Sequence, residues 1–542
     1  MKTWQLAIAA LASAVCTLFS VAPYGSGIAG ILSATLLILV ALHAKTTKGA
    51  MGWVFVFQIP LWLWLHSWVE TVAFAGWIGL GLYMSTWASL FVLLLRKIHQ
   101  NTQISVVVSA PIVWVGLECL RGIVLFDGYP WYLAGAVVLD WPLISIVTIG
   151  GVWLASFLVL AIAGLLATIK QVRWWTSTAV GCVILVLCLH RFGYDFIERE
   201  SSVLNVAVIQ TNVLQSNKVA WSWQRQQEDV AKAIELTYQA VAQDPKPEIV
   251  IWPETMLPGS GFETGREQFE PWDEEFLPLW YWAEVLRVTA NKIDTPILVG
   301  AQTWFDITII KEPNSLRVET GKQFNSAVLV FPDGHTQRYD KTFLTPFGEK
   351  IPYLSVVPAL QDWVRDTFGA AMLFDLHVGG GPERFALPVI PKSGEGAVTT
   401  FATPICFEDT VPSVVRELVW ENGRRKSEFL VNLSNDGWFG DDTIAHQQHV
   451  REARMRCLEN RTPMIRAANT GISCYINIFG KVVRELPSLE SGILQIEIRP
   501  GLQRPISRII GDLVAWLSLI GSILLVINAF IRRSKEHDEI AT

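Results

Sequence analysis

Residues 398–408 read Val-Thr-Thr-Phe-Ala-Thr-Pro-Ile-Cys-Phe-Glu, a largely apolar run that leads into the thiol of Cys406. Its β-branched and aromatic residues favour a strand, and a short apolar run of this kind is typical of a strand buried in a sheet. The stretch therefore predicts a domain built on a β-sheet, with a candidate nucleophile at the end of one strand.

Two other strand-like runs also end on charged residues. Glu254 closes the run Glu-Ile-Val-Ile-Trp-Pro-Glu at 248–254, and Lys341 follows Arg-Tyr-Asp at 338–340. These groups suit nucleophilic acyl transfer, because a thiolate attacks, a base takes the thiol proton and a fixed cation stabilises the oxyanion. Taken singly, such a cysteine is more often a core residue, the lysine a surface ion pair and Pro-Glu a turn. Their occurrence in one domain favours the functional interpretation.

Two more carboxylates lie near these residues in the sequence. Glu349 follows Lys341 at a short distance, and Glu408 stands two positions after Cys406. A nearby carboxylate favours the charged form of an amine. We therefore expect Glu349 and Glu408 to orient the lysine and to tune the charge of the site.

Strands and helices alternate across residues 195–505, which predicts a layered α/β domain. Three segments interrupt this alternation: 261–285 and 308–322 look like surface insertions, and 366–395 looks like a loop or arm. The strand-like runs lie at 203–210, 249–252, 296–301, 326–331, 396–402, 429–433 and 464–468, and the helical patterns lie at 224–243 and 446–460.

The composition of the whole chain points to a membrane protein. The 542 residues are 51% hydrophobic and only 17% charged, which is too apolar for a soluble enzyme of this size. The apolar excess lies in residues 1–192 and 508–531. A net charge of −6 provides no basic field for nucleic acid. The seven cysteines show neither a disulfide framework nor metal-site spacing, so we expect no metal.

Eight stretches are apolar enough to span a bilayer, which needs about 20 residues. Seven fall in residues 1–192, which we predict to be a membrane domain, and 508–531 is the eighth. Basic residues cluster after alternate spans, so both termini and the tail 532–542 should be cytoplasmic and 195–505 should face outward. The start also resembles a cleaved signal peptide, but we expect a retained helix. The spans lie at approximately 4–22, 27–44, 50–66, 72–95, 103–121, 143–167, 173–191 and 508–531.

The segment between the fifth and sixth spans carries charges next to aromatic residues. Glu118 and Arg121 precede an Asp127-Gly-Tyr-Pro-Trp131 turn. Charges at membrane depth are costly and are usually paired or functional. One interpretation is an interfacial loop with aromatic anchors and a local Glu118–Arg121 pair, and the other is a role in handling lipid or substrate.

Several motifs together resemble the nitrilase superfamily, and specifically its membrane-bound branch, the bacterial apolipoprotein N-acyltransferases. The resemblance covers nearly the whole chain and implies a polytopic α-helical membrane domain plus an α/β nitrilase-like (α-β-β-α sandwich) extracytoplasmic domain. The motifs are Ile-Trp-Pro-Glu254, Tyr-Asp-Lys341, Pro346-Phe-Gly-Glu349, Ile-Cys406-Phe-Glu408, Ser434-Asn-Asp-Gly-Trp-Phe-Gly440, Ala22-Pro-Tyr-Gly25, Glu118-Cys-Leu-Arg121-Gly, Gly128-Tyr-Pro-Trp131, Gly150-Gly-Val-Trp-Leu-Ala-Ser-Phe157 and Ala453-Arg-Met-Arg-Cys-Leu-Glu459.

The resemblance implies a catalytic triad of Glu254, Lys341 and Cys406. It also implies supporting roles for Glu349 and Glu408. Two positions depart from the family pattern: Phe407 stands where many members have tyrosine, and Gly437 stands where a larger residue is common, which would loosen its loop. The candidate substrate-binding residues are Trp221, Trp223, Phe407 and Trp438.

The resemblance further implies a ping-pong reaction. Cys406 takes an acyl chain from a phospholipid, with phosphatidylethanolamine as the expected donor, and passes it to the α-amine of a diacylated apolipoprotein. The implied enzyme is a monomer in the bacterial inner membrane with its catalytic domain in the periplasm, and it needs no cofactor. A membrane-tethered amidase or nitrilase-type hydrolase would use the same triad. A single anchor helix would suffice to tether such a hydrolase, whereas seven predicted spans precede the domain here. A non-catalytic lipid-binding scaffold is the third interpretation, and against it all three triad positions carry the expected chemistry.

Overall fold

The computed structural model describes residues 1–170, 181, 204–213, 221–263, 277–312, 315–353, 376–389, 397–501 and 503–541. The chain forms two compact units. The first comprises Met1–Arg199, Gln447–Met455 and Pro505–Thr542, and the second comprises Glu200–His446 and Arg456–Arg504. The grouping of Gln447–Met455 with the first unit is a feature that the sequence did not indicate.

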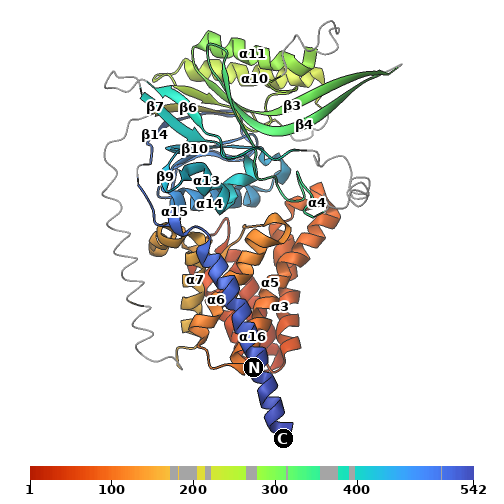
Figure 1. The fold of residues 1–542 in the computed structure, drawn as a ribbon, viewed down its shortest axis with the longest axis vertical. Coiled ribbons are helices and arrows are strands. Elements are labelled where there is room, and N and C mark those ends of the chain that lie inside the picture. The colour runs from red at the N-terminus through yellow and green to blue at the C-terminus, as the bar shows by residue number, and fades with distance from the viewer. Residues whose placement is uncertain are drawn as a thin grey trace. The chain divides into compact units, whose positions relative to one another are not determined.

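The first unit is helical (Figure 1). Ser26 and Thr46 accept hydrogen bonds from the backbone N–H groups of Ala29 and Gly49, and these caps fix the starts of the second and third helices. The main described helices are α1 (Thr3–Ser20), α2 (Gly27–His43), α3 (Thr47–Leu65), α4 (Trp68–Val72), α5 (Phe74–Asn101), α6 (Val106–Cys119), α7 (Val147–Ala167), α15 (Ser507–Ile510) and α16 (Leu513–Ala541).

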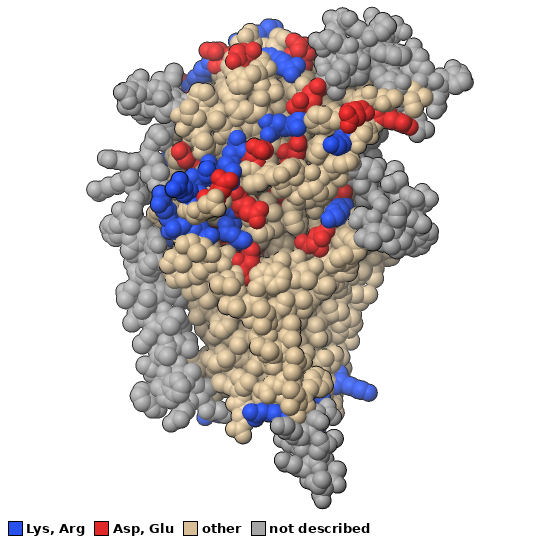
Figure 2. Space-filling view, viewed as in Figure 1, with Lys and Arg blue, Asp and Glu red and all other residues tan. Residues whose placement is uncertain are grey.

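Five helical segments of the described chain are long and apolar enough to cross a membrane, and the apolar helix α2 is shorter. On α16, Leu517, Leu524 and Phe530 are 58%, 61% and 63% exposed, which suits lipid rather than water. Figure 2 shows a broad face of this unit without charged side chains. The predicted span at 173–191 lies outside the described residues. The five segments are Thr3–Ser20, Phe74–Asn101, Val106–Asp127, Pro142–Ala167 and Leu513–Arg532.

Glu118 and Arg121 bind separate partners, so the local pair that one of the two interpretations assumed is not formed. The Arg121 guanidinium donates to the backbone carbonyl oxygens of Trp131 and Tyr132, at 2.7 and 3.4 Å. The Glu118 carboxylate accepts from the Ala134 backbone N–H at 2.6 Å. Both side chains therefore hold the turn after α6 by binding its backbone, where few other polar partners exist.

The second unit contains two six-stranded sheets. In the first sheet the order is β14-β1-β2-β3-β4-β5, and in the second it is β13-β12-β11-β10-β7-β6. The first is built from β1 (Leu204–Gln210), β2 (Ile249–Ile251), β3 (Ile297–Glu312), β4 (Ser315–Val330), β5 (Thr336–Asp340) and β14 (Gly492–Ile498). The second is built from β6 (Phe385–Val389), β7 (Ala397–Ala402), β10 (Phe429–Ser434), β11 (Met464–Ala468), β12 (Ser473–Ile476) and β13 (Val482–Leu486).

Parallel strands lie at the centre of both sheets, where they are buried. β1 pairs with β2 and β2 with β3 in parallel, and β10 pairs in parallel with both β7 and β11. All the residues of β2 and β10 are buried, as near-continuous apolar strands predict. The outer pairs, such as β1–β14 and β11–β12, are antiparallel.

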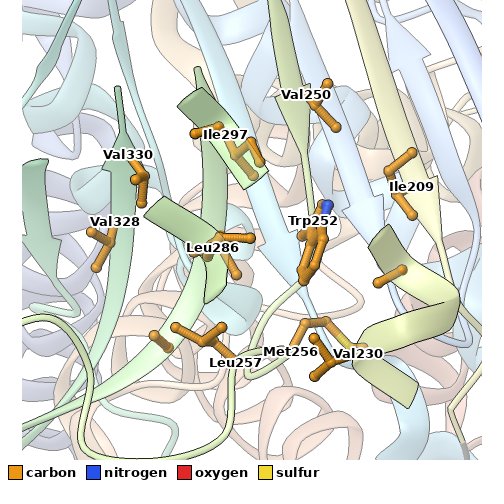
Figure 3. Close-up of a cluster of buried hydrophobic side chains, with 14 of the residues drawn as sticks. Ile209, Val230, Val250, Trp252, Met256, Leu257, Leu286, Ile297, Val328 and Val330 are labelled. Carbon is orange, nitrogen blue, oxygen red and sulfur yellow. The ribbon is translucent and has the colours of Figure 1, made fainter. Parts of the chain in front are cut away.

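Helices cover the sheets of the second unit. α10 (Trp223–Val241) and α11 (Leu277–Ile293) pack on the first sheet through one apolar cluster, which Figure 3 shows. Trp252 lies fully buried in this cluster, and its indole N–H donates to Thr237 Oγ1 on α10 at 2.9 Å. α13 (Pro412–Val419) and α14 (Thr443–Asn460) follow strands of the second sheet.

Two sequence predictions in this unit are wrong. Residues 277–285 are not a surface insertion but the first half of α11, because Trp282 and Ala283 are buried in the apolar cluster. Within the predicted loop 366–395, β6 is a strand paired with β7. In the segment predicted as an insertion at 308–322, the described residues 308–312 and 315–322 continue β3 and β4 as paired strands (Figure 1).

Candidate active site

Cys406 begins a 3-10 helix, η8 (Cys406–Thr410), that follows β7. Its φ of +51° is unusual for a residue with a Cβ and costs about 1–3 kcal/mol, so the surrounding structure must hold it. The Asn432 amide on β10 does so by donating to the carbonyl oxygens of Pro404 and Cys406, at 3.1 and 3.2 Å. The adjoining strand therefore fixes the turn that carries the thiol.

Glu254 follows the end of β2 and is only 5% exposed. Its Oε1 accepts from the Asn325 side-chain amide at 2.7 Å, and its Oε2 accepts from the Asn435 backbone N–H at 2.8 Å. Gly300 lies directly behind it, where an added Cβ would stand 2.5 Å from the Glu254 Cα. Two donors thus hold the carboxylate, and the backbone that carries it lies too close to Gly300 for a side chain at that position.

Lys341 follows β5 and is 1% exposed, which excludes the surface ion pair considered from the sequence. Its ammonium lies 2.7 Å from Glu349 Oε2 and donates to Thr345 Oγ1 at 3.3 Å. Glu349 is fixed in turn, because it accepts from the Thr345 backbone N–H at 2.8 Å and from the Asn325 amide at 3.1 Å. Asn325 therefore connects Glu254 with Glu349, and Glu349 orients the amine.

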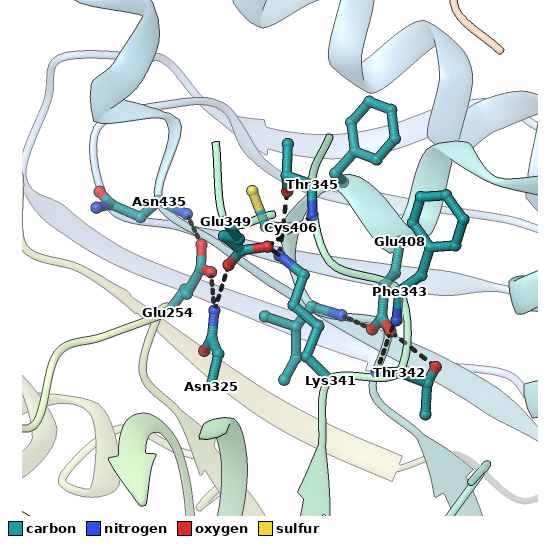
Figure 4. Close-up of polar contacts among 12 residues, drawn as sticks. Glu254, Asn325, Lys341, Thr342, Phe343, Thr345, Glu349, Cys406, Glu408 and Asn435 are labelled. Carbon is teal, nitrogen blue, oxygen red and sulfur yellow. Dashed lines mark hydrogen bonds and ion pairs between the residues drawn. The ribbon is translucent and has the colours of Figure 1, made fainter. Parts of the chain in front are cut away.

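Glu408 faces away from this group and holds the backbone around it (Figure 4). It is fully buried and uses both oxygens as acceptors. The donors are the Ile405 N–H at 2.7 Å, the Thr342 N–H at 2.8 Å and hydroxyl at 3.0 Å, the Phe343 N–H at 2.9 Å and the Tyr339 hydroxyl at 2.9 Å. One carboxylate thus joins the segment after Lys341 to the turn of Cys406.

Burial and charge set the protonation states of the proposed nucleophile and base. Burial, and next the Glu254 carboxylate, raise the pKa of the Cys406 thiol well above its usual value, against the opposing effect of Lys341. Burial also raises the pKa of Glu254. A thiol with a raised pKa is protonated at neutral pH, so it needs an adjacent base in order to attack.

The amine of Lys341 remains protonated in the buried site. Burial alone would lower the pKa of the Lys341 ammonium, but Glu349, the Cys406 group and Glu254 together raise it. Lys341 in turn lowers the pKa of Glu349 against the effect of burial. The arrangement therefore places a protonated thiol, a carboxylate and a permanent ammonium together (Figure 4). Their chemistry is that of thiol-based acyl transfer.

Comparison with known proteins gives the family. The carbon-nitrogen hydrolase family model matches residues 205–508, more than half of the chain. The chain belongs to the carbon-nitrogen hydrolase family. The model of the apolipoprotein N-acyltransferase N-terminal domain matches residues 13–165. These matches confirm the resemblance stated from the motifs, and they confirm the predicted fold class of a helical membrane part plus a nitrilase-like α/β domain.

Two curated relatives of this carbon-nitrogen hydrolase family member carry the name apolipoprotein N-acyltransferase. That of Geobacter metallireducens is 29% identical over 84% of this chain and 80% of its own length. That of Vibrio cholerae is 28% identical over 91% of each chain. Among solved structures, a carbon-nitrogen hydrolase from Helicobacter pylori G27 has 16% identity and a TM-score of 0.36, over 55% of this chain and 89% of that chain. With its apolar helices, the chain is a multi-pass bacterial membrane protein.

The structure separates the predicted substrate-binding residues of this carbon-nitrogen hydrolase family member. Trp223 packs on Tyr281 and Trp282 against the apolar cluster of the first sheet, which is the environment of a core residue. The Trp221 indole donates to Asp229 at 2.9 Å. Phe407 and Trp438 remain candidates: Phe407 stacks near Phe343, with 6.1 Å between ring centroids, and Trp438 lies in the 3-10 helix η9 (Asp436–Phe439) together with Gly437.

Two residues of the site were missed from the sequence. Asn325 bridges Glu254 and Glu349 from the middle of the long strand β4, where nothing marks a polar residue as buried. Asn435 supplies a backbone N–H, which no side-chain pattern reports. The motif at 434–440 was recognised, but its link to Glu254 was not.

Proposed function

We propose that this protein is an apolipoprotein N-acyltransferase, an acyltransferase of lipoprotein maturation. The observation that carries the proposal is the convergence of Glu254, Lys341 and Cys406 in a chain whose helical part matches the N-terminal domain of those enzymes. The names of the listed relatives support the same activity. The acyl donor is a phospholipid, with phosphatidylethanolamine as the expected one, and the enzyme works as a monomer.

In the first half-reaction the thiol of Cys406 attacks the ester carbonyl carbon of the phospholipid. Glu254 takes the thiol proton as the C–S bond forms, and the ammonium of Lys341 stabilises the oxyanion. The C–O bond of the ester then breaks, and the protonated Glu254 returns the proton to the leaving alkoxide. The products are a lysophospholipid and an acyl thioester on Cys406.

In the second half-reaction the α-amine of the diacylglyceryl-cysteine attacks the thioester. Glu254 takes a proton from the amine, the C–S bond breaks, and the Cys406 thiolate recovers the proton. The product is an amide, so the lipoprotein carries three acyl chains. Because water would waste the thioester, delivery of both lipid substrates from a bilayer favours transfer over hydrolysis.

The location follows from the substrates and from the basic residues. Positive residues at the ends of spans mark the cytoplasmic side of a membrane. We propose that this protein resides in the inner membrane, with residues 195–505 in the periplasm, where diacylated apolipoproteins meet phospholipid. The residues that mark the cytoplasmic side are Lys45, Lys48, Arg96, Lys97, Lys170, Arg173, Arg532, Arg533 and Lys535.

The deciding experiment is incubation of the detergent-solubilised protein with acyl-labelled phosphatidylethanolamine, followed by mass analysis of the Cys406 peptide. An acyl adduct that is discharged by a diacylated lipopeptide establishes the transferase. An adduct that only water discharges identifies the amidase or nitrilase-type hydrolase. A folded protein without an adduct would favour the lipid-binding scaffold and overturn the proposal.

Replacing Lys341 with alanine should slow thioester formation by about 10²-fold or more, because the oxyanion loses its cation. The measurement is the single-turnover rate of acyl transfer to Cys406, together with a thermal unfolding curve, since Glu254 and Glu349 lose a buried partner. The matched control is Lys426→Ala, which breaks an exposed 2.9 Å pair with Glu421 and should leave the rate unchanged. An effect of Lys341→Ala as small as that of the control would remove the lysine from the mechanism.

A further inference from the structure

A fully buried arginine lies behind the candidate site. Arg466 on β11 is 0% exposed and pairs with two carboxylates that are also buried, Asp409 and Asp436. One guanidinium nitrogen binds Asp409, and the other lies 3.4 Å from Asp436 Oδ2. No catalytic role described above uses any of the three.

The two aspartates belong to the two turns that carry the chemistry. Asp409 lies in η8, the 3-10 helix that begins at Cys406. Asp436 begins η9, directly after Asn435, whose backbone N–H donates to Glu254. A single side chain on β11 therefore binds both the turn of the nucleophile and the turn that orients the base.

The Asp436 carboxylate is fixed on its other sides as well. Its Oδ1 accepts from the Ser434 hydroxyl at 2.5 Å. Gly471 packs against Oδ2 so closely that a Cβ there would lie 2.0 Å from it. The backbone N–H of Asn469, two residues before this glycine, donates to the Ser434 carbonyl oxygen at 3.1 Å. These contacts and the pair with Arg466 together leave the η9 turn little freedom.

Stability alone does not account for such a cluster. Taking an ion triad out of water is costly, and well-packed apolar residues in its place are often equally or more stable. What apolar residues cannot supply is a directional link between two turns and a compensating charge. We propose that Arg466 is a positioning residue for acyl transfer, which locks the Cys406 and Asn435 turns together and screens the thiol from Asp436.

This inference rests on the proposed roles of Cys406 and Glu254. The charges that act on the thiol support it: Glu254, Asp436 and Glu349 raise the pKa of Cys406, and Lys341 lowers it. Arg466 and Cys406 also interact electrostatically, because a thiolate at Cys406 raises the pKa of the Arg466 guanidinium. The same attraction acts in the other direction, so the positive charge of Arg466 favours the thiolate form of Cys406. The remaining carboxylate, that of Glu408, raises the pKa of the Lys341 ammonium.

The charges give opposite predictions for two substitutions. Asp436→Asn removes a negative charge and should shift the pH midpoint of Cys406 ionisation down, whereas Arg466→Met removes a positive charge and should shift it up. Arg466→Lys keeps the charge and should stay near the wild-type midpoint. All three should nevertheless slow acylation, because each weakens the link between the two turns.

The experiment measures alkylation of the Cys406 peptide by iodoacetamide against pH in the full-length solubilised protein, with thermal unfolding as a check on folding. The control is Glu459→Gln, which alters another buried pair of the same unit, that with Arg456, 3.0 Å long. It should lower the unfolding temperature without moving the midpoint. If Arg466→Met does not fold, Asp436→Asn and Arg466→Lys carry the test.

The decisive result is an Asp436→Asn variant whose thiol is more acidic and yet acylates more slowly. An unchanged midpoint in Asp436→Asn, or the same shift in the Glu459→Gln control, would reduce Arg466 to a structural ion pair and overturn the inference. Failure of the proposed function is a separate outcome, because it would show as a wild-type protein that is alkylated at Cys406 but never acylated there.

Discussion

Replacing Cys406 with alanine should abolish the acyl-enzyme, because no other group of the site can form a thioester. The side chain keeps part of its surface exposed at the start of η8, whereas the described cysteines of the same unit, Cys457 and Cys474, are buried. Mass analysis after incubation with labelled phosphatidylethanolamine should find the acyl chain on the Cys406 peptide of the wild type and no thioester in the variant.

Two further variants test whether the loss is specific to the Cys406 thiol. Cys474→Ala removes a thiol of the second sheet that plays no part in the mechanism, and it should leave the adduct intact. Cys406→Ser puts a hydroxyl in nearly the same place, but an alcohol is a much weaker nucleophile than a thiolate, so acylation of this position, which would now give an oxygen ester, should also be lost. Normal thioester labelling in Cys406→Ala would end the assignment of the nucleophile.

The sequence was sufficient to predict that the three candidate catalytic residues each follow a strand. The runs 249–252 and 398–402 predict strands by composition, and each is followed within a few positions by a side chain of acid–base or nucleophilic chemistry, Glu254 or Cys406. The strands β2 and β7 are found where these runs lie. The positions of Glu254 and Cys406 at the strand ends therefore follow from local pattern alone.

The surroundings of these residues were not predictable, because they depend on partners far away in the chain. Glu254 binds the backbone N–H of Asn435, 181 positions later. Arg466 and Asn325 are polar residues in strands, and in a sequence a buried polar residue looks the same as an exposed one. Segment 277–285 was mistaken for an insertion for the converse reason, since the acidic residues before it hid the apolar face of α11.

Replacing Glu254 with glutamine should slow acylation of Cys406 by about 10²- to 10⁴-fold at neutral pH, the usual range for loss of a general base. The loss should shrink as the pH rises, because hydroxide then takes over the removal of the thiol proton. The structure gives the direction of this pH dependence. The Glu254 carboxylate raises the pKa of the Cys406 thiol, so in the variant, which lacks that charge, the thiol ionises at a lower pH.

Some of the effect will be structural, and its size can be bounded. Glu254 accepts from the Asn325 amide with one oxygen and from the Asn435 N–H with the other, whereas glutamine has only one acceptor. One donor therefore loses its partner, at a cost of about 1–3 kcal/mol that thermal unfolding will report. Glu497→Gln, the same change at an exposed position on β14, serves as the control and should alter neither rate nor stability. A Glu254→Gln variant that is destabilised but acylates at the wild-type rate would show that the carboxylate holds the fold and that another group takes the proton.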